Sequence, residues 1–166
     1  LSGQSVVSIY IDNSFSMDAT ERNGTLLDEA KKKAEEIIKA YGPSDKFQLL
    51  TNDFWGKQQR LLSNEDFFEE LNNVRISSFS RNLDEVLSRQ TDALNSSTSV
   101  NKSAYVISDF QKSMFKNDNI TADTGIFVHL VPLASEVKKN IFIDTCYFTS
   151  PSRKVNEPEE LIVKIK

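Results

Sequence analysis

The stretch SVVSIYIDNSFSM, residues 5–17, decides the fold. Its first part, Ser5 to Asp12, is a β-branched and aromatic run without a helical period. Such a run is typical of a strand buried on both faces at the centre of a parallel sheet. After a polar segment, apolar residues recur on one face of a helix from Leu26 to Tyr41, and Thr25 with Asp28 forms a capping-box pattern before it. A buried strand followed by an amphipathic helix is the opening unit of an α/β fold.

Strand-like and helix-like segments alternate along the rest of the chain. The further strand-like runs are residues 46–51, 57–62, 103–109, 125–132 and 141–148, and helical stripes cover 63–71 and 82–94. The run at 57–62 follows its predecessor closely enough for a hairpin, so we expect an antiparallel edge strand there. The alternation predicts an α/β fold of the Rossmann-like kind, a three-layer, doubly wound, mostly parallel sheet with one antiparallel edge strand.

The length of 166 residues suits one ordinary domain. We expect that domain to cover residues 1–140, with residues 141–166 supplying a last strand and an extension. Within the extension, Glu160 to Lys166 alternates like a half-exposed strand. This leaves open the alternative that residues 141–166 begin a following β domain.

Charge and composition exclude several classes of function. The net charge is -4 and the isoelectric point about 5.1, so electrostatic attraction to nucleic acid is absent. The single cysteine, Cys146, excludes an internal disulfide and a zinc site built on several thiolates. No apolar run approaches the roughly 20 residues needed to cross a bilayer. We expect a soluble piece of a longer protein.

Two of the expected buried strands end in an aspartate, Asp12 and Asp109. In open α/β sheets, ligands bind outside the carboxyl ends of the strands, so both carboxylates would share one rim. Hydroxyls follow the first aspartate at two-residue steps, as Ser14 and Ser16. Carboxylates and hydroxyls are hard oxygen ligands that suit Mg²⁺ or Mn²⁺. We expect a divalent cation site formed by these four residues.

The pattern Asp12-x-Ser14-x-Ser16 after a hydrophobic strand, with Asp109 ending a later one, resembles the metal-ion-dependent adhesion site of von Willebrand factor A domains. The resemblance covers about residues 5–133, including the order of elements. It implies a protein-binding module whose Mg²⁺ or Mn²⁺ accepts a carboxylate from a protein partner, without a small-molecule substrate. The sequence YIDNSFSM, residues 10–17, also resembles that of the membrane-anchored aerotolerance (Bat-like, BatA) proteins of anaerobic gut bacteria. That resemblance implies a membrane-anchored parent with this domain outside the bilayer, periplasmic rather than cytoplasmic.

The chain departs from the family pattern at several positions. Phe15 and Phe110 stand where the family usually has glycine. The family's metal-ligating threonine aligns with Arg81, whose guanidinium could take the place of the cation and pair with the aspartates, or bind the partner. A shift of one residue or more in this loop would instead bring in Ser80 or Ser78 as the missing hydroxyl.

Two further functions stay open. A metal-free scaffold domain would carry Arg81 in place of the ion. A Mg²⁺-dependent phosphohydrolase would use Asp12 as nucleophile, but Ser14 occupies the place of the second carboxylate that such enzymes use. The sequence also lacks a phosphate-binding glycine loop and a second histidine, so we do not expect an enzyme.

Trp55 is open to two interpretations, as a recognition residue or as a cover for the sheet edge.

Overall fold

A computed structural model describes residues 3–21, 24–115, 124–134, 143–148 and 160–165. The chain divides into two compact units, Leu1–Ser135 and Glu136–Lys166. Parts of two expected segments, residues 141–142 and 151–158, lie outside the described residues.

The first unit is built on a four-stranded sheet with the order β4-β1-β5-β6. The strands are β1 (Ser5–Ile11), β4 (Lys46–Thr51), β5 (Asn101–Ser108) and β6 (Phe127–Pro132). All three neighbouring pairs are parallel. The first strand, expected at the centre from its uninterrupted apolar run, is paired on both sides and buried from Val6 onward. An accessory two-stranded pair, β2 (Thr20–Glu21) with β3 (Gly24–Thr25), precedes the first helix.

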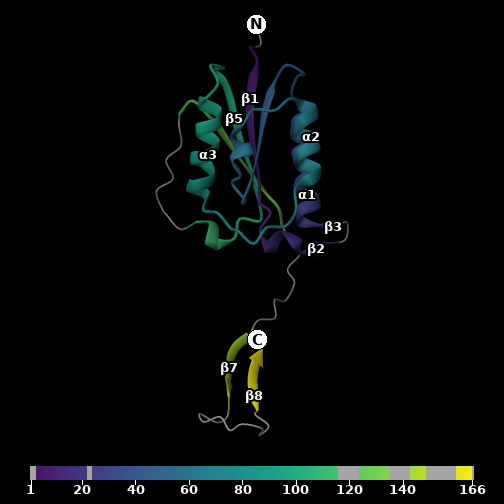
Figure 1. The fold of residues 1–166 in the computed structure, drawn as a ribbon, viewed down its shortest axis with the longest axis vertical. Helices are drawn as coiled ribbons and strands as arrows, with labels where there is room; N and C mark the ends of the chain where they lie inside the picture. The colour runs from purple at the N-terminus through teal and green to yellow at the C-terminus, as the bar shows by residue number, and fades with distance from the viewer. Residues whose placement is uncertain (1–2, 22–23, 116–123, 135–142, 149–159, 166) are drawn as a thin grey trace. The chain divides into compact units, whose positions relative to one another are not determined.

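Helices cover both faces of the sheet (Figure 1). On one face lie α1 (Leu26–Lys39) and α2 (Asn64–Asn73), and on the other lies α3 (Leu83–Asn95). The side chains of β1 alternate between the two layers of core. Val7, Ile9 and Ile11 pack in the cluster that contains the apolar residues of α1 and α2, whereas Tyr10 packs with those of α3. This arrangement confirms the predicted three-layer, mostly parallel α/β fold.

The prediction of a regular antiparallel edge strand at residues 57–62 is wrong. The segment begins with the 3-10 helix η2 (Gly56–Gln59), and only one antiparallel bridge, between Phe47 and Leu62, joins it to β4. The side chain of Gln58 contacts the strand instead: it accepts a hydrogen bond from the backbone N–H of Thr51 at 3.4 Å and donates one to its hydroxyl at 2.8 Å. We call residues 56–62 the arch, because within the described residues their backbone pairs with β4 only at the single bridge between Phe47 and Leu62.

The second unit contains two described strands, β7 (Ile143–Phe148) and β8 (Leu161–Ile165), which pair antiparallel. The described part of the expected strand at 141–148 therefore pairs with the tail strand in a two-stranded sheet. Among the helices of the described residues, none is long and apolar enough to cross a membrane.

Candidate functional site

The order of the strands makes the carboxyl ends of β1 and β5 the point where the strand connections change direction. The chain leaves β1 for β4 on one side and later crosses to β5 on the other side of β1. Strand connections that depart in opposite directions leave a gap above the two strand ends, and ligands of open α/β sheets bind in such gaps. Asp12 directly follows β1 and Asp109 directly follows β5. We call Asp12, Ser14, Ser16 and Asp109 the rim site.

Asp12 is buried and fixed in one orientation by three hydrogen-bond donors. Its Oδ1 accepts from the backbone N–H of Ser14 at 2.9 Å and from the side chain of Asn52 at 2.8 Å. Its Oδ2 accepts from the hydroxyl of Ser108 at 2.6 Å. Ser108 lies 96 positions away in sequence, so parallel pairing of β1 with β5 joins these two strand ends.

Asp109 directly follows Ser108 at the end of β5, and one of its carboxylate oxygens has no hydrogen-bond donor. Its Oδ2 accepts a hydrogen bond from Gln111 at 3.1 Å, whereas its Oδ1 is buried and has no hydrogen-bond partner. A buried carboxylate oxygen without a donor is costly, because its hydration is lost and not replaced. An oxygen in this state is a fitting ligand for a positively charged group.

The buried hydroxyl of Tyr10 interacts with the charged groups around the strand ends. Tyr10 donates a hydrogen bond to Asn52 Oδ1 at 2.6 Å. Burial raises the pKa of Tyr10 well above its ordinary value, and the charges of Asp12 and, more weakly, Asp109 raise it further. Arg81 and the hydrogen bond to Asn52 act in the opposite direction. Both aspartates and Arg81 therefore lie within electrostatic reach of one hydroxyl.

The two serines lie on the turn that follows β1. Ser14 precedes the 3-10 helix η1 (Phe15–Asp18), which the buried side chain of Met17 anchors to the core. The turn brings the hydroxyl oxygens of Ser14 and Ser16 to 3.1 Å from each other, and both residues are partly exposed. The side chain of Phe15, between them in sequence, is 70% exposed.

The donor set fits a small divalent cation. Mg²⁺ binds six oxygens at about 2.0–2.1 Å in an octahedron, so adjacent ligand oxygens lie roughly 3 Å apart. The hydroxyl oxygens of Ser14 and Ser16 have this separation, at 3.1 Å. Asp109 contributes the buried oxygen that has no donor, and Asp12 the second negative charge. The ion would supply positive charge that a carboxylate of another molecule could share.

Acidic, thiol and imidazole side chains alone do not form a metal site among the described residues. Among the described residues, no group of three or more His, Cys, Asp and Glu side chains is placed to hold a metal ion. A cation at the rim site would therefore depend on the serine hydroxyls in addition to the two aspartates.

The remaining predicted residues lie in the loop between α2 and α3. Arg81 donates from Nε to the backbone oxygen of Asn52 at 2.9 Å, and its guanidinium lies over the rings of Phe54 at 4.5 Å and Phe79 at 5.6 Å. In the described residues it forms no ion pair with either aspartate of the rim site. Ser80 and Ser78 are exposed, and no hydrogen bond among the described side chains joins them to the rim site.

A second layer of polar residues supports the rim site and was not anticipated from the sequence. Asn13 is buried: its amide nitrogen donates to Asp53 at 3.0 Å and to the backbone oxygen of Arg75 at 2.7 Å, and its side-chain oxygen accepts from the backbone of Asn52. Ser77 donates its hydroxyl to Asp53 at 2.7 Å. Asn52 and Asp53 follow β4 just as Asp12 follows β1, so a polar pair at a third strand end was the available signal. Nothing distinguishes Ser77 from its neighbouring serines in sequence.

Two phenylalanines near the strand ends adopt left-handed backbone conformations, Phe54 with φ 51° and Phe110 with φ 48°. Bulky side chains rarely adopt this conformation, which costs on the order of 1–3 kcal/mol. Both rings pack against the α3-side core cluster, which offsets the cost. The ring of Phe54 also lies beneath Arg81 and, at 5.2 Å, Arg89.

The geometry is therefore that of two neighbouring strand ends, each followed by an aspartate, with the hydroxyls of Ser14 and Ser16 on the turn after β1 and Arg81 bound to the backbone of Asn52. Searches against protein-family models, curated proteins and solved structures found no match to this chain.

Proposed function

We propose that the chain is a protein-binding module of the von Willebrand factor A type. The rim site would hold Mg²⁺ or Mn²⁺, and the ion would accept a carboxylate from a protein partner. The observation that carries this proposal is the buried Oδ1 of Asp109, which lacks a donor and follows the strand that pairs with β1, the strand that Asp12 follows. A cation would neutralise both acids and satisfy that oxygen.

Arg81 would act as the second cation that receives the partner. Its Nε is bound to Asn52, whose side chain is bound to Asp12, so one residue links the guanidinium to the rim site. The rings of Phe54 and Phe79 hold its plane, and a planar guanidinium can bind a carboxylate through two parallel hydrogen bonds. Phe15, Phe79 and Phe115 are exposed, at 70%, 54% and 46%, and would add apolar contact area.

The proposed role is binding without catalysis. Asp12, the residue that a phosphohydrolase would use as nucleophile, has three donors on its carboxylate. Such hydrogen bonds stabilise the charge and make the oxygens poorer nucleophiles. The family resemblance alone supports a further proposal, that the parent protein is membrane-anchored and that this domain works outside the bilayer, in the periplasm.

The test is metal-dependent stabilisation of the full chain. We expect 10 mM Mg²⁺ or Mn²⁺, added after EDTA treatment, to raise the melting temperature by about 3–6 °C if the dissociation constant is about 1 mM. Asp109→Asn should abolish this increment while raising the melting temperature in EDTA, because the unpaired buried charge disappears. Asp18→Asn, at an exposed position on the same turn, is the matched control and should keep the increment.

The same measurements separate the metal-free scaffold from the metal site. If Arg81 replaced the ion, wild type would not respond to Mg²⁺, and Arg81→Ala would lower the free energy of unfolding by several kcal/mol. If the metal site is real, Arg81→Ala keeps the metal-dependent increment. No response of wild type to either ion would overturn the proposed function.

A further inference from the structure

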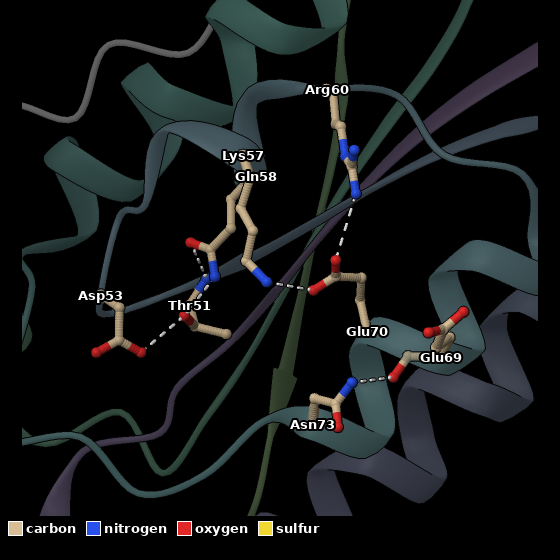
Figure 2. A network of polar contacts seen from close by, with 8 residues as sticks. All are labelled: Thr51, Asp53, Lys57, Gln58, Arg60, Glu69, Glu70 and Asn73. Atoms are coloured by element: carbon tan, nitrogen blue, oxygen red, sulfur yellow. Dashed lines mark hydrogen bonds and ion pairs between the residues drawn. The ribbon is translucent and has the colours of Figure 1, made fainter.

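A cavity of about 180 Å³ lies between the arch and the end of α2, beside β4. Figure 2 shows the polar side chains around it, with Thr51 on β4, Lys57 and Gln58 in the arch, and Glu70 on α2. The cavity is smaller than the roughly 300–1,000 Å³ of pockets for drug-sized ligands, and it suits one side chain or a compact molecule. We call it the arch pocket.

The floor of the arch pocket is apolar. Leu49 of β4, Leu62 of the arch and Val74 after α2 line it and are themselves almost fully buried, and Ile76 adds to the same wall. An apolar group that enters the pocket would be removed from water against these side chains, which favours binding at about 25 cal/mol per Å².

An aromatic side chain borders the pocket on the arch side. Trp55 is 57% exposed, and the ammonium group of Lys57 lies 5.1 Å from the centre of its ring. Exposed tryptophans next to a cation frequently anchor ligands, because the ring offers a large apolar face at small entropic cost. Trp55 is also the only tryptophan of the chain, so its signals report on this pocket alone.

The mouth of the pocket is positively charged, although the whole chain carries a net charge of -4. Lys57 and Arg60 share a single acceptor: Glu70 accepts from Lys57 at 2.8 Å and from Arg60 at 3.3 Å. Arg75 is a third cation in the lining, and one nitrogen of its guanidinium donates to the backbone oxygens of Asn72 at 2.6 Å and Val74 at 2.9 Å. The other acidic residue, Asp53, directs both oxygens to Asn13, Thr51 and Ser77 at the inner end. The cations at the mouth therefore exceed the anions.

The walls are fixed before any ligand arrives. The side chain of Gln58 binds the backbone and hydroxyl of Thr51, and Gln48 donates to the backbone oxygen of Gln58 at 2.8 Å. A preformed pocket avoids the entropic cost of ordering its walls on binding. The arch thus keeps the cavity open where a regular edge strand would have filled it.

From these observations we infer that the arch pocket is a binding site for a compact apolar group that carries a carboxylate. The apolar group occupies the floor beside Trp55, and the carboxylate meets Lys57, Arg60 and Arg75 at the mouth. Two sources share this chemistry, a free aliphatic or aromatic carboxylic acid and the carboxyl-terminal residue of a peptide. The site needs no metal ion and is independent of the proposed function.

The experiment titrates the ¹⁵N-labelled full chain in EDTA with N-acetyl-L-leucine and, in parallel, with its uncharged amide. We expect the single indole resonance to move with a dissociation constant on the order of 1 mM. The acid should bind about threefold to tenfold more tightly than the amide, and added salt should shrink this difference. A peptide that ends in leucine with a free carboxylate, compared with its amidated form, identifies the source: tighter binding than N-acetyl-L-leucine assigns the site to chain ends, weaker binding to free acids.

Lys57→Gln should weaken binding of the acid and leave binding of the amide unchanged. Lys33→Gln is the matched control, since Lys33 forms a surface ion pair of similar length, 2.9 Å with Glu36, on another helix face. An indole resonance that stays in place up to 20-fold above the expected dissociation constant would overturn the inference. Equal affinities for acid and amide, or equal effects of the two lysine substitutions, would overturn the role of the charged mouth. Because EDTA is present throughout, none of these results bears on the metal proposal.

Discussion

Tyr10 shows how one buried hydroxyl connects the core of the sheet to its functional edge. Its ring packs against α3, and its hydroxyl donates to Asn52, the residue that also binds Asp12. The side chain is 1% exposed, so the neutral form is strongly favoured in the folded state. The pKa is raised from 10.0, and ionisation at high pH therefore favours the unfolded chain.

We expect Tyr10→Phe to lower the free energy of unfolding at pH 7 by about 1–3 kcal/mol, because Asn52 Oδ1 loses its donor. Stability from Tyr10 is complete below pH 10 and declines above it, since the unfolded state then loses a proton that the folded state keeps. The gap between wild type and variant should therefore shrink above pH 10, approaching about 1.4 kcal/mol per pH unit. Urea unfolding followed by Trp55 fluorescence measures both curves.

The comparison isolates Tyr10 because other titrating groups are common to both proteins. Tyr105, whose pKa burial and the neighbouring Tyr41 also raise, contributes equally to each curve. Curves that stay parallel between pH 10 and 11.5 would show that Tyr10 ionises as readily in the folded protein as in the unfolded one.

At the scale of elements, the junction between β3 and α1 depends on a glycine. Gly24 has φ +123°, and a Cβ there would lie 2.9 Å from Asp28 Oδ2. That oxygen accepts hydrogen bonds from the backbone and the hydroxyl of Thr25, which lower the pKa of Asp28. The capping box of α1 consists of the backbone bond from Thr25 and its reciprocal, the backbone N–H of Asp28 donating to the hydroxyl of Thr25 at 3.1 Å. A methyl group at Gly24 would strain the backbone and would also displace the Asp28 carboxylate that caps α1.

We expect Gly24→Ala to lower the free energy of unfolding by about 1–3 kcal/mol. Gly56→Ala is the matched control, because a Cβ at Gly56 meets nothing within 4 Å. That substitution should be neutral or stabilise by up to about 1 kcal/mol through the unfolded state. Calorimetry of both variants decides the matter, and equal destabilisation would refute the role of the cap.

The elements that local patterns predict well are those whose pattern matches their burial. β1 has an uninterrupted apolar run because it is covered on both faces, and α1 has a clear stripe and a capping box. Residues 57–62 were predicted as a strand because they follow β4 closely enough for a hairpin, yet Gln58 replaces backbone pairing with a side chain. Such a replacement depends on a neighbour distant in sequence, and no local pattern encodes it.

The candidate site was predictable to the same extent. Asp12 and Asp109 follow directly from two buried strands that end in acids, and the structure brings Asp12 together with Ser108. The support from Asn13, Asn52 and Ser77 arises from contacts between three separate loops. These contacts exist only once the strand order is set, so they could not be inferred from spacing.

At the scale of the whole molecule, the first unit contains all three apolar clusters, whose buried residues lie between Val6 and Leu133. The described residues of the second unit form a two-stranded pair with several exposed apolar side chains. Those more than 40% exposed are Tyr147, Phe148, Leu161, Val163 and Ile165. A pair of strands without further cover is marginally stable in water.

We therefore expect a chain truncated after Ser135 to unfold cooperatively in urea, with a free energy within about 1 kcal/mol of the full chain. The separate peptide 136–166 should show no cooperative transition. Far-UV circular dichroism of both pieces and of the full chain provides the measurement. A truncated chain that fails to fold, or loses more than about 1 kcal/mol, would show that the first unit is not self-sufficient.

The arch also limits the pairing of the β4 edge with strands of other protein molecules. A free strand border is a template on which other chains polymerise. Here Leu62 occupies the backbone groups of Phe47, and Gln58 occupies the N–H of Thr51, so an incoming segment would have to expel both. This edge of the sheet is therefore protected against edge-to-edge aggregation. Gln58 and Leu62, which line the arch pocket, provide that protection.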